Sequence, residues 1–420
     1  MDAAADAIDS SDVASTDGDS AIPADAGVPD ADGSAPDADG GAPDVPSDGD
    51  GDGATLSVVT CAPDVCAPVV ASPCATDGGV SSCVSLNVDP SSLDELALAA
   101  KATEVGMAWT EAAGGTLHFT RFGAGSSVLS DRAFAGFGGM PGDASYPSGL
   151  SASASPTGWL VAVSRQAPVL LKLDATGGLQ TARALPSHQG GPGTYATVVA
   201  GAGDASLLSW SFFDRTVHLQ QVDAEGAPLG VALAVADVQV WDEVGVADGF
   251  VFAKCSTVGL ELSHLGADGT LNPGDTMPLG SGSPFTPSCT HLVVARRGTG
   301  VRIAFQPVSS TDGSVKTCFQ DATSGGSFVA GPSCTGSGGA QTPTETMFVT
   351  GDDSTVMLAG SGLVRWTESA TGPTRTPLTT LDVFWASALV QQGSDAVIAA
   401  VDQLTPGEPS FIFARIPVAP

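Results

Sequence analysis

The stretch from Leu207 to Val235, LLSWSFFDRTVHLQQVDAEGAPLGVALAV, decides how the rest of the chain is interpreted. Apolar residues at Val217, Leu219 and Val222 are separated by polar ones, and a second alternating run follows the tight turn Asp223–Gly226. Alternation with a period of two is typical of a strand with one buried face. A turn that contains glycine reverses the chain at low steric cost. The stretch therefore predicts antiparallel strands joined by a hairpin turn.

A single hairpin of this size is only marginally stable in water, so it must pack against copies of itself. Units of the same plan recur along the chain at spacings of roughly 40 to 55 residues, the range expected for four-stranded blades. We therefore expect an all-β fold, a β-propeller with seven four-stranded blades; six or eight blades, a β-sandwich and two smaller β domains are the alternatives. The seven units are marked by apolar runs that we expect to be the inner strands: Val105–Trp109, Trp159–Val163, Leu207–Trp210, Phe250–Ala253, Val301–Phe305, Val356–Ala359 and Ala396–Ala400.

Ring closure needs a strand from outside the seventh unit, because the chain ends at Pro420 with no room for a fourth strand. Thr55–Thr60 and Val84–Val88 both resemble strands, and either could close the last blade. Closure would remove exposed strand edges, which otherwise promote aggregation. Ser92–Leu96 resembles a helix capping box, but the alternation that follows it favours a first strand of blade one.

Charge divides the chain unevenly. The formal net charge is −31, and the first 100 residues carry 20 acidic residues and no Lys or Arg. Residues 1–53 contain almost no large apolar side chains, so we expect a disordered acidic tether. Residues 54–92 are expected to form a Cys-containing transition segment with a possible closing strand, and residues 93–420 the propeller. So acidic a chain repels nucleic acid and anionic lipid.

One part of the tether resembles half of a calcium-binding loop. Asp48, Asp50 and Asp52 alternate with glycine as in the first half of an EF-hand, but Val59 stands where the bidentate Glu is needed. A solvated spacer is therefore favoured over weak calcium binding. We expect no cofactor and no other metal site.

The cysteines are eight in number and form no CxxC pair. An even number without metal-ligand spacing predicts disulfides and an oxidising, extracytoplasmic compartment. Cys61, Cys66, Cys74 and Cys83 are expected to form two local disulfides of undefined connectivity, and local pairing favours Cys255 with Cys289 and Cys318 with Cys334. No apolar run is long enough to span a bilayer. The given chain shows no signal peptide, so either the protein is cytoplasmic or a start segment has been trimmed or missed. The cysteines favour the second alternative.

Catalytic motifs are not apparent: the sequence contains no HExxH, P-loop or GxSxG. Five histidines are scattered, and three of them, His118, His218 and His264, are expected at equivalent places in different units, which repeat equivalence explains as well as a metal site does. No catalytic residue is proposed. Propellers usually bind ligands through loops on one face, and the loop residues we regard as candidate ligand contacts are Glu111, Phe137, Tyr146, Arg165, His188, Tyr195, Asp214 and Arg215.

An Asp/Ala/Gly/Pro-rich tether followed by Cys-containing β-repeats resembles exported bacterial surface lipoproteins with a propeller domain. The resemblance covers the whole chain and rests on composition and repeat plan. It implies a secreted, periplasmic or surface protein, with a lipid anchor, where one exists, outside the given chain. We expect a monomeric, non-catalytic binding or scaffold module that recognises protein or glycan. The alternative is a propeller-type hydrolase or lyase with its site at the central channel.

Overall fold

The computed structural model consists almost entirely of strands. Besides two short 3-10 helices, η1 (Pro90–Ser92) and η2 (Ala124–Ser126), every regular element in its described part is a β-strand. No helix in this part is long and apolar enough to cross a membrane. The structure describes residues 59–60, 69–74, 80–111, 116–135, 149–164, 168–185, 195–201, 203–212, 215–279, 289–307, 316–335, 343–359, 362–368, 372–379, 383–405 and 408–418.

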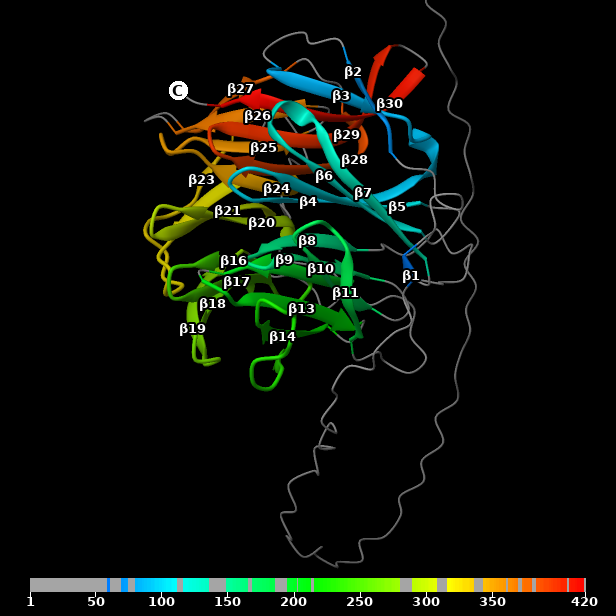
Figure 1. Cartoon of the computed structure of the whole chain (residues 1–420). Coiled ribbons are helices and arrows are strands. Elements are labelled where there is room, and N and C mark those ends of the chain that lie inside the picture. Colours follow the sequence, from blue (N-terminus) through cyan, green and yellow to red (C-terminus); the bar gives the residue numbers. More distant parts are fainter. Residues whose placement is uncertain are drawn as a thin grey trace, which may run out of the picture. The chain divides into compact units, whose positions relative to one another are not determined.

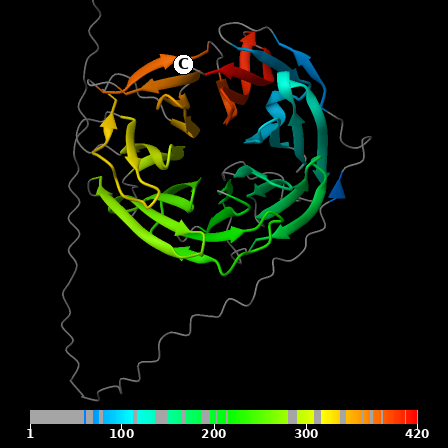
Figure 2. The ribbon, with the colours of Figure 1, turned by 60° about the vertical axis from the view of Figure 1, so that its left-hand side comes forward.

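Seven antiparallel sheets surround one axis, which makes the domain a seven-bladed β-propeller, as the sequence predicts (Figure 2). In blades 2 to 6 the strands run in chain order from the axis outward, and in every blade we call them the inner, second, third and outer strand. Each inner strand contacts the inner strands of its two neighbouring blades, and β28 of the last blade contacts β4 of the first. The ring is therefore closed at its centre.

Most blades have four strands, and blades 1 and 7 each gain one at the outer edge. Blade 1 consists of β4 (Leu93–Ala100), β5 (Val105–Glu111), β6 (Leu117–Phe122) and β7 (Val128–Ala135). Blade 2 consists of β8 (Leu150–Ser155), β9 (Gly158–Val163), β10 (Val169–Asp174) and β11 (Leu179–Ala184). Blade 3 consists of β12 (Tyr195–Ala200), β13 (Ser206–Phe212), β14 (Thr216–Val222) and β15 (Leu233–Val235). Blade 4 consists of β16 (Val240–Val246), β17 (Gly249–Cys255), β18 (Gly259–Gly266) and β19 (Leu271–Pro278). Blade 5 consists of β20 (Cys289–Arg297), β21 (Gly300–Pro307), β22 (Cys318–Ala322) and β23 (Ser333–Cys334). Blade 6 consists of β24 (Pro343–Val349), β25 (Thr355–Ala359), β26 (Gly362–Thr367) and β27 (Thr374–Pro377).

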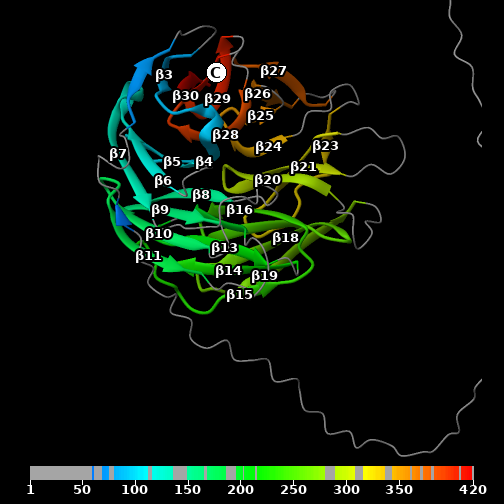
Figure 3. The same ribbon diagram turned by 90° about the vertical axis from the view of Figure 1, so that its right-hand side faces the viewer.

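Blade 7 combines both ends of the chain. Its first three strands are β28 (Val383–Gln392), β29 (Asp395–Thr405) and β30 (Glu408–Pro417), and its outer strand is β3 (Ser82–Leu86). In the antiparallel register Leu86 lies opposite Phe411 and Ser82 opposite Arg415. Figure 3 shows β3 beside β30. The predicted closure by an N-terminal strand is thus confirmed. The other strand-like segment has a different place: β1 (Val59–Thr60) pairs with β7 outside blade 1, and β2 (Ala71–Pro73) flanks β3 (Figure 1).

The hydrophobic core lies between the blades. All six residues of the second strand β9 are buried, because both of its faces contact neighbouring blades. The apolar runs that reveal the repeat in the sequence are therefore the second strands, and the inner strands precede them. Trp109 and Trp210 are 1% and 4% exposed and belong to this packing layer. At the junction of blades 1 and 7, the rings of Phe122 and Phe413 stack with centroids 3.8 Å apart.

The turn Asp223–Gly226 forms as its sequence predicts. The Gly226 amide donates to the Asp223 carbonyl over 3.0 Å, and Gly226 has a φ of 74°, where a side chain would be strained. Asp223 Oδ1 accepts from the amides of Glu225 and Ala227 at 2.9 and 2.8 Å. The carboxylate thus stabilises the hairpin turn itself.

Three disulfides are present in the described part of the chain. Cys255–Cys289 and Cys318–Cys334 are the pairings that the sequence favours, and Cys74–Cys83 links the end of β2 to β3. Cys61 and Cys66 lie outside the described residues, as do Asp48, Asp50, Asp52 and the whole segment expected to be a tether.

Candidate ligand-binding face

The two faces of the ring differ in how the strands are connected. On one, here called the short-turn face, tight turns join inner to second strands and third to outer strands, for example between Ser155 and Gly158. On the other, the long-connection face, second strands lead to third strands, and each outer strand leads to the next inner strand. Here the chain runs from Ala135 to Leu150, and from Pro278 to Cys289, before it enters the next blade.

On the short-turn face, side chains of one blade donate hydrogen bonds to backbone carbonyls of the next blade. Lys172 Nζ in blade 2 donates over 2.6 Å to the carbonyl of Ala224 in the blade 3 turn. Gln221 Nε2 in blade 3 donates over 2.7 Å to the carbonyl of Gly266 in blade 4. Lys172 is 1% exposed, and burial lowers the pKa of its ammonium group. These side chains serve the frame and are poor candidates for ligand contacts.

Arg302 has the same role between blades 5 and 6. Its guanidinium pairs with Asp321 in its own blade over 2.8 Å. It also donates to Thr355 Oγ1 over 3.0 Å and lies 2.9 Å from a carboxylate oxygen of Glu368, both in blade 6. The short-turn face is therefore a fixed frame.

The inner strands are irregular at the opposite end. Inner strands start at the long-connection face. There, the pairing between inner and second strands shifts register in blades 1, 5, 6 and 7. In blades 2, 3 and 4 the same pairing is continuous. Blades 5, 6, 7 and 1 are neighbours in the ring, so the shifts form one bulged arc around the axis. Such bulges re-aim side chains and are common next to functional sites. The arc comprises the shifted segments Leu93–Glu95, Thr290–Val293, Pro343–Met347 and Val383–Ser387.

His291 and Asp94 are exposed members of the bulged arc. His291 has a φ of 50°, in the left-handed region that few residues other than glycine adopt. A conformation of this kind costs free energy, and such residues cluster at functional sites. The two side chains bring an imidazole and a carboxylate to the long-connection face.

Asp242 and Glu243 are acidic neighbours on β16, outside the arc. Glu243 is 2% exposed, and its Oε1 accepts from Ser209 Oγ over 2.8 Å and from Thr197 Oγ1 in blade 3. Asp242 Oδ2 accepts from the Val294 amide of blade 5 over 2.6 Å. Loss of hydration raises the pKa of both carboxyl groups, and for Asp242 the charge of Glu243 raises it further. The pair connects the inner strands of three blades.

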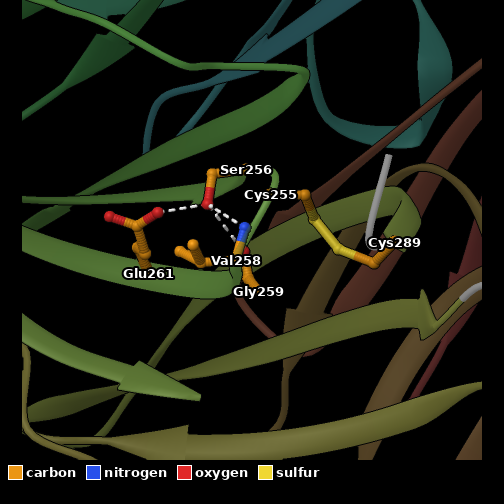
Figure 4. The surroundings of a disulfide bond; sticks show 6 residues. All are labelled: Cys255, Ser256, Val258, Gly259, Glu261 and Cys289. Carbon is orange, nitrogen blue, oxygen red and sulfur yellow. Dashed lines mark hydrogen bonds between the residues drawn. A yellow bond between two sulfur atoms is a disulfide. The ribbon is translucent and has the colours of Figure 1, made fainter. Parts of the chain in front are cut away.

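A rigid corner joins blades 4 and 5 on the long-connection face (Figure 4). The disulfide Cys255–Cys289 links the end of β17 to the start of β20, and both residues are fully buried. Beside it, Ser256 Oγ donates to Glu261 and accepts from the Val258 amide over 3.2 Å. Val258 is 55% exposed at the tip of this turn. The corner presents an apolar side chain on a fixed backbone.

The candidate ligand contacts are only partly visible. Glu111 ends β5, and Arg215 begins the approach to β14 with a φ of 65°; both lie at the long-connection face, but in different blades, and no described contact joins them. Tyr195 opens β12, and only its backbone is described. Phe137, Tyr146, Arg165, His188 and Asp214 lie outside the described residues.

The expected equivalence of three histidines is correct for two. His118 stacks on Trp109 and His218 on Trp210, each across the same strand pair of its blade. The inclusion of His264 is wrong: it lies opposite Val251, near the short-turn face, with Nε2 3.6 Å from Asp248. Within the described ranges, no three His, Cys, Asp or Glu side chains are placed to hold one metal ion.

Sequence reasoning missed the bulged arc and the Asp242–Glu243 pair. A register shift leaves no mark in an alternation pattern, so only paired coordinates reveal it. The two adjacent acids in an otherwise strand-like run, VWDEVGV, were the one available signal for the pair. A carboxylate inside an inner strand is costly unless it is hydrogen-bonded or neutral.

No protein-family model matches the chain, and no curated protein sequence matches it. Solved structures with a similar fold include the polysaccharide lyase Uly1, which has a TM-score of 0.50 and 9% sequence identity over 77% of this chain and 90% of that one. The SapL1 lectin in complex with α-methyl fucoside has a TM-score of 0.43 and 12% identity over 68% and 95% of the two chains. AofleA from Arthrobotrys oligospora has a TM-score of 0.42 and 16% identity over 62% and 81%. At these identities the likeness concerns the propeller fold alone.

Proposed function

We propose that the chain is a non-catalytic binding module whose ligand-binding surface is the long-connection face, centred on the bulged arc. The observation that carries this proposal is the distribution of the register shifts between inner and second strands. They occur at one end of the inner strands, in four neighbouring blades, and the side chains of Lys172 and Gln221 join blades at the other end. A rigid frame that presents irregular connections on one face is a common plan for recognition.

The proposed ligand is a protein or a glycan. The net charge of −31 disfavours nucleic acid and anionic membrane surfaces. We further propose an extracytoplasmic location, which the three disulfides support. In this proposal residues 1–53 act as a spacer, residues 54–92 as a transition segment, and residues 93–420 as a monomeric propeller.

A hydrolase or lyase is the second candidate, and the Asp242–Glu243 pair favours it. Carboxyl groups with raised pKa values near the axis of a propeller could act as a general acid and base. Against this reading, each carboxyl group already accepts hydrogen bonds from a neighbouring blade. An enzyme would lose its activity in both Asp242→Asn and Glu243→Gln, whereas a binding module would keep its affinity.

The test is a screen of the full chain against glycan and surface-protein arrays, followed by variants on both faces. Asp94→Ala and His291→Ala change exposed residues of the bulged arc, and Asp204→Ala removes an exposed carboxylate from the short-turn face as the matched control. We expect the first two to weaken binding by about tenfold or more and the control to leave it unchanged. Equal effects on both faces, or an effect of Asp204→Ala alone, would contradict the proposal.

A further inference from the structure

The disulfide Cys318–Cys334 lies at the outer edge of blade 5, and its two cysteines differ in exposure. Cys334 ends the two-residue outer strand β23 and is exposed, whereas Cys318 opens the third strand β22 and is 2% exposed. Cys318 lies opposite the fully buried Phe305 and belongs to the core between blades 4 and 5. Solvent therefore reaches the sulfur–sulfur bond from the side of Cys334.

The other two disulfides of the described part are less accessible. Cys255 and Cys289 are both fully buried where blade 4 meets blade 5. In the Cys74–Cys83 disulfide, Cys74 is half-buried and Cys83 is 6% exposed. Exchange between a thiol and a disulfide requires a thiolate to approach the sulfur that it attacks, so access governs the rate. Cys334 is the cysteine at which a dissolved thiol meets the least obstruction among these six.

Hydrogen bonds hold the outer segment of blade 5 on both sides of the disulfide. The Thr335 amide donates to the Thr317 carbonyl over 2.9 Å, and the Thr317 amide donates to Thr335 Oγ1 over 3.1 Å. Earlier in the segment, the Val329 amide donates to the Asp321 carbonyl over 3.0 Å. These bonds do not involve sulfur, so they persist when the disulfide is cleaved.

Blade 3 has the same strand pair without a disulfide. His218 lies opposite Ala234 in β14 and β15, at the place that Cys318–Cys334 has in β22 and β23. The outer segment of blade 3 is fixed by the same kind of bond, from the Leu229 amide to the Gln221 carbonyl over 2.8 Å. An outer strand of this plan therefore forms without a covalent link. Cleavage of the blade 5 disulfide should leave β23 in place and the ring folded.

We propose that Cys318–Cys334 is a site of reversible thiol–disulfide exchange, which a small thiol attacks at Cys334. The thiol loses its proton to solvent, and its thiolate forms a new bond to Cys334 Sγ while the bond to Cys318 breaks. The electron pair of the broken bond leaves on Cys318 Sγ, which takes up a proton. A second thiolate then displaces Cys334, which also takes up a proton, and the two small thiols depart as their own disulfide. Exchange with an oxidised small thiol reverses both steps.

The first experiment exposes the full chain to reduced glutathione under native conditions, blocks free thiols with N-ethylmaleimide at successive times, and locates the label by peptide mass spectrometry. Cys318 and Cys334 should become labelled about tenfold or more faster than Cys255 and Cys289, because only the first pair is accessible. Near-ultraviolet circular dichroism should stay that of the folded chain meanwhile. Equal labelling rates for the two pairs, or loss of this signal in step with labelling, would overturn the proposal.

Two single variants test which sulfur is attacked. Cys318→Ser and Cys334→Ser remove the same disulfide, so they are matched in the cross-link that they lose. With oxidised glutathione, the exposed Cys334 thiol of the first variant should form a mixed disulfide about tenfold or more faster than the buried Cys318 thiol of the second. In guanidinium chloride, where both chains are unfolded, the two rates should agree. Equal rates in the folded variants, or faster reaction of Cys318, would contradict attack at Cys334.

Discussion

Glu243 is a titratable carboxyl group, able to bind one proton, at the junction of blades 3 and 4. Its Oε1 accepts two hydroxyl hydrogen bonds, while Oε2 is buried and has no partner in the described structure. Burial without a counter-charge raises the pKa of the carboxyl group. The folded chain therefore binds this proton more tightly than the unfolded chain does. The stabilisation is fully present below the unfolded pKa and is lost as the pH rises through the folded pKa.

The variant Glu243→Gln should remove much of this pH dependence, because the amide keeps the shape and the acceptor oxygen but cannot ionise. As the pH rises above the ordinary pKa of a glutamate and through the raised pKa of folded Glu243, the wild type should lose stability relative to the variant. Denaturant unfolding at several pH values measures the difference.

Asp242 has a raised pKa as well, so the double variant with Asp242→Asn should be flatter still. Glu225→Gln removes one exposed carboxylate and serves as the control. Parallel stability curves for the wild type and Glu243→Gln would show that Glu243 is ionised in the folded chain.

Lys172 shows how the short-turn face depends on single side chains. Its ammonium group donates to Ser155 Oγ, Thr157 Oγ1 and the Ala224 carbonyl at 3.0, 2.6 and 2.6 Å. Lys172→Met keeps the buried stem and leaves three acceptors without this donor. We expect the free energy of unfolding to fall by about 1–3 kcal/mol. Thermal or urea unfolding measures it, with Arg375→Met on the exposed strand β27 as the control; equal effects would mean that the contact between blades contributes little.

At the scale of elements, the disulfides divide into links within a blade and a link between blades. Cys318–Cys334 joins two neighbouring strands of blade 5 across 16 residues, and Cys255–Cys289 joins blade 4 to blade 5 across 34 residues. In the chain-entropy model a loop of the shorter length contributes about 3 kcal/mol and the longer one about 0.7 kcal/mol more.

Replacing each pair with serines should therefore destabilise the chain in the order Cys255–Cys289, then Cys318–Cys334. Unfolding midpoints of the two double variants under non-reducing conditions measure this order. A reversed order would mean that the contact between blades 4 and 5 is already fixed by packing alone.

The elements were more predictable than the site. Alternation and Asp-x-x-Gly turns such as Asp223–Gly226 identify strands and hairpins, because both signals are local. Local signals do not say which strand of a blade is innermost, so the apolar runs proved to be second strands. They also did not separate His264 from His118 and His218, which requires strand register. The bulged arc depends on pairing between strands, which no single-sequence pattern contains.

The closing strand was predictable for a different reason. Seven units with one strand missing at the C-terminus require a strand from elsewhere, and two segments had the right composition. The structure selects Ser82–Leu86, whose Cys83 and Leu86 are buried against blade 7 and its neighbours. Thr60 instead extends blade 1. The choice between the two segments depended on contacts far apart in the sequence.

At the scale of the whole molecule, every blade buries its apolar faces against two neighbours, so stability depends on a closed ring. The ring closes twice, through the contact of β28 with β4 at the axis and through β3 at the outer edge of blade 7. Additional contacts cross the same junction, since Arg415 donates to the Gly123 carbonyl over 3.1 Å and Ser82 Oγ lies 2.8 Å from Ser126 Oγ. Loss of β3 would expose the edge of β30 and weaken this junction.

The most direct test of the closed ring is the melting temperature of two truncated chains. Removal of residues 1–58 leaves β1, β2 and β3 in place, and its midpoint should equal that of the full chain. Removal of residues 1–86 deletes β3 and the Cys74–Cys83 disulfide, and its midpoint should fall by roughly 10 °C or more. Equal midpoints for the two truncated chains would contradict closure of the ring by the N-terminal strand.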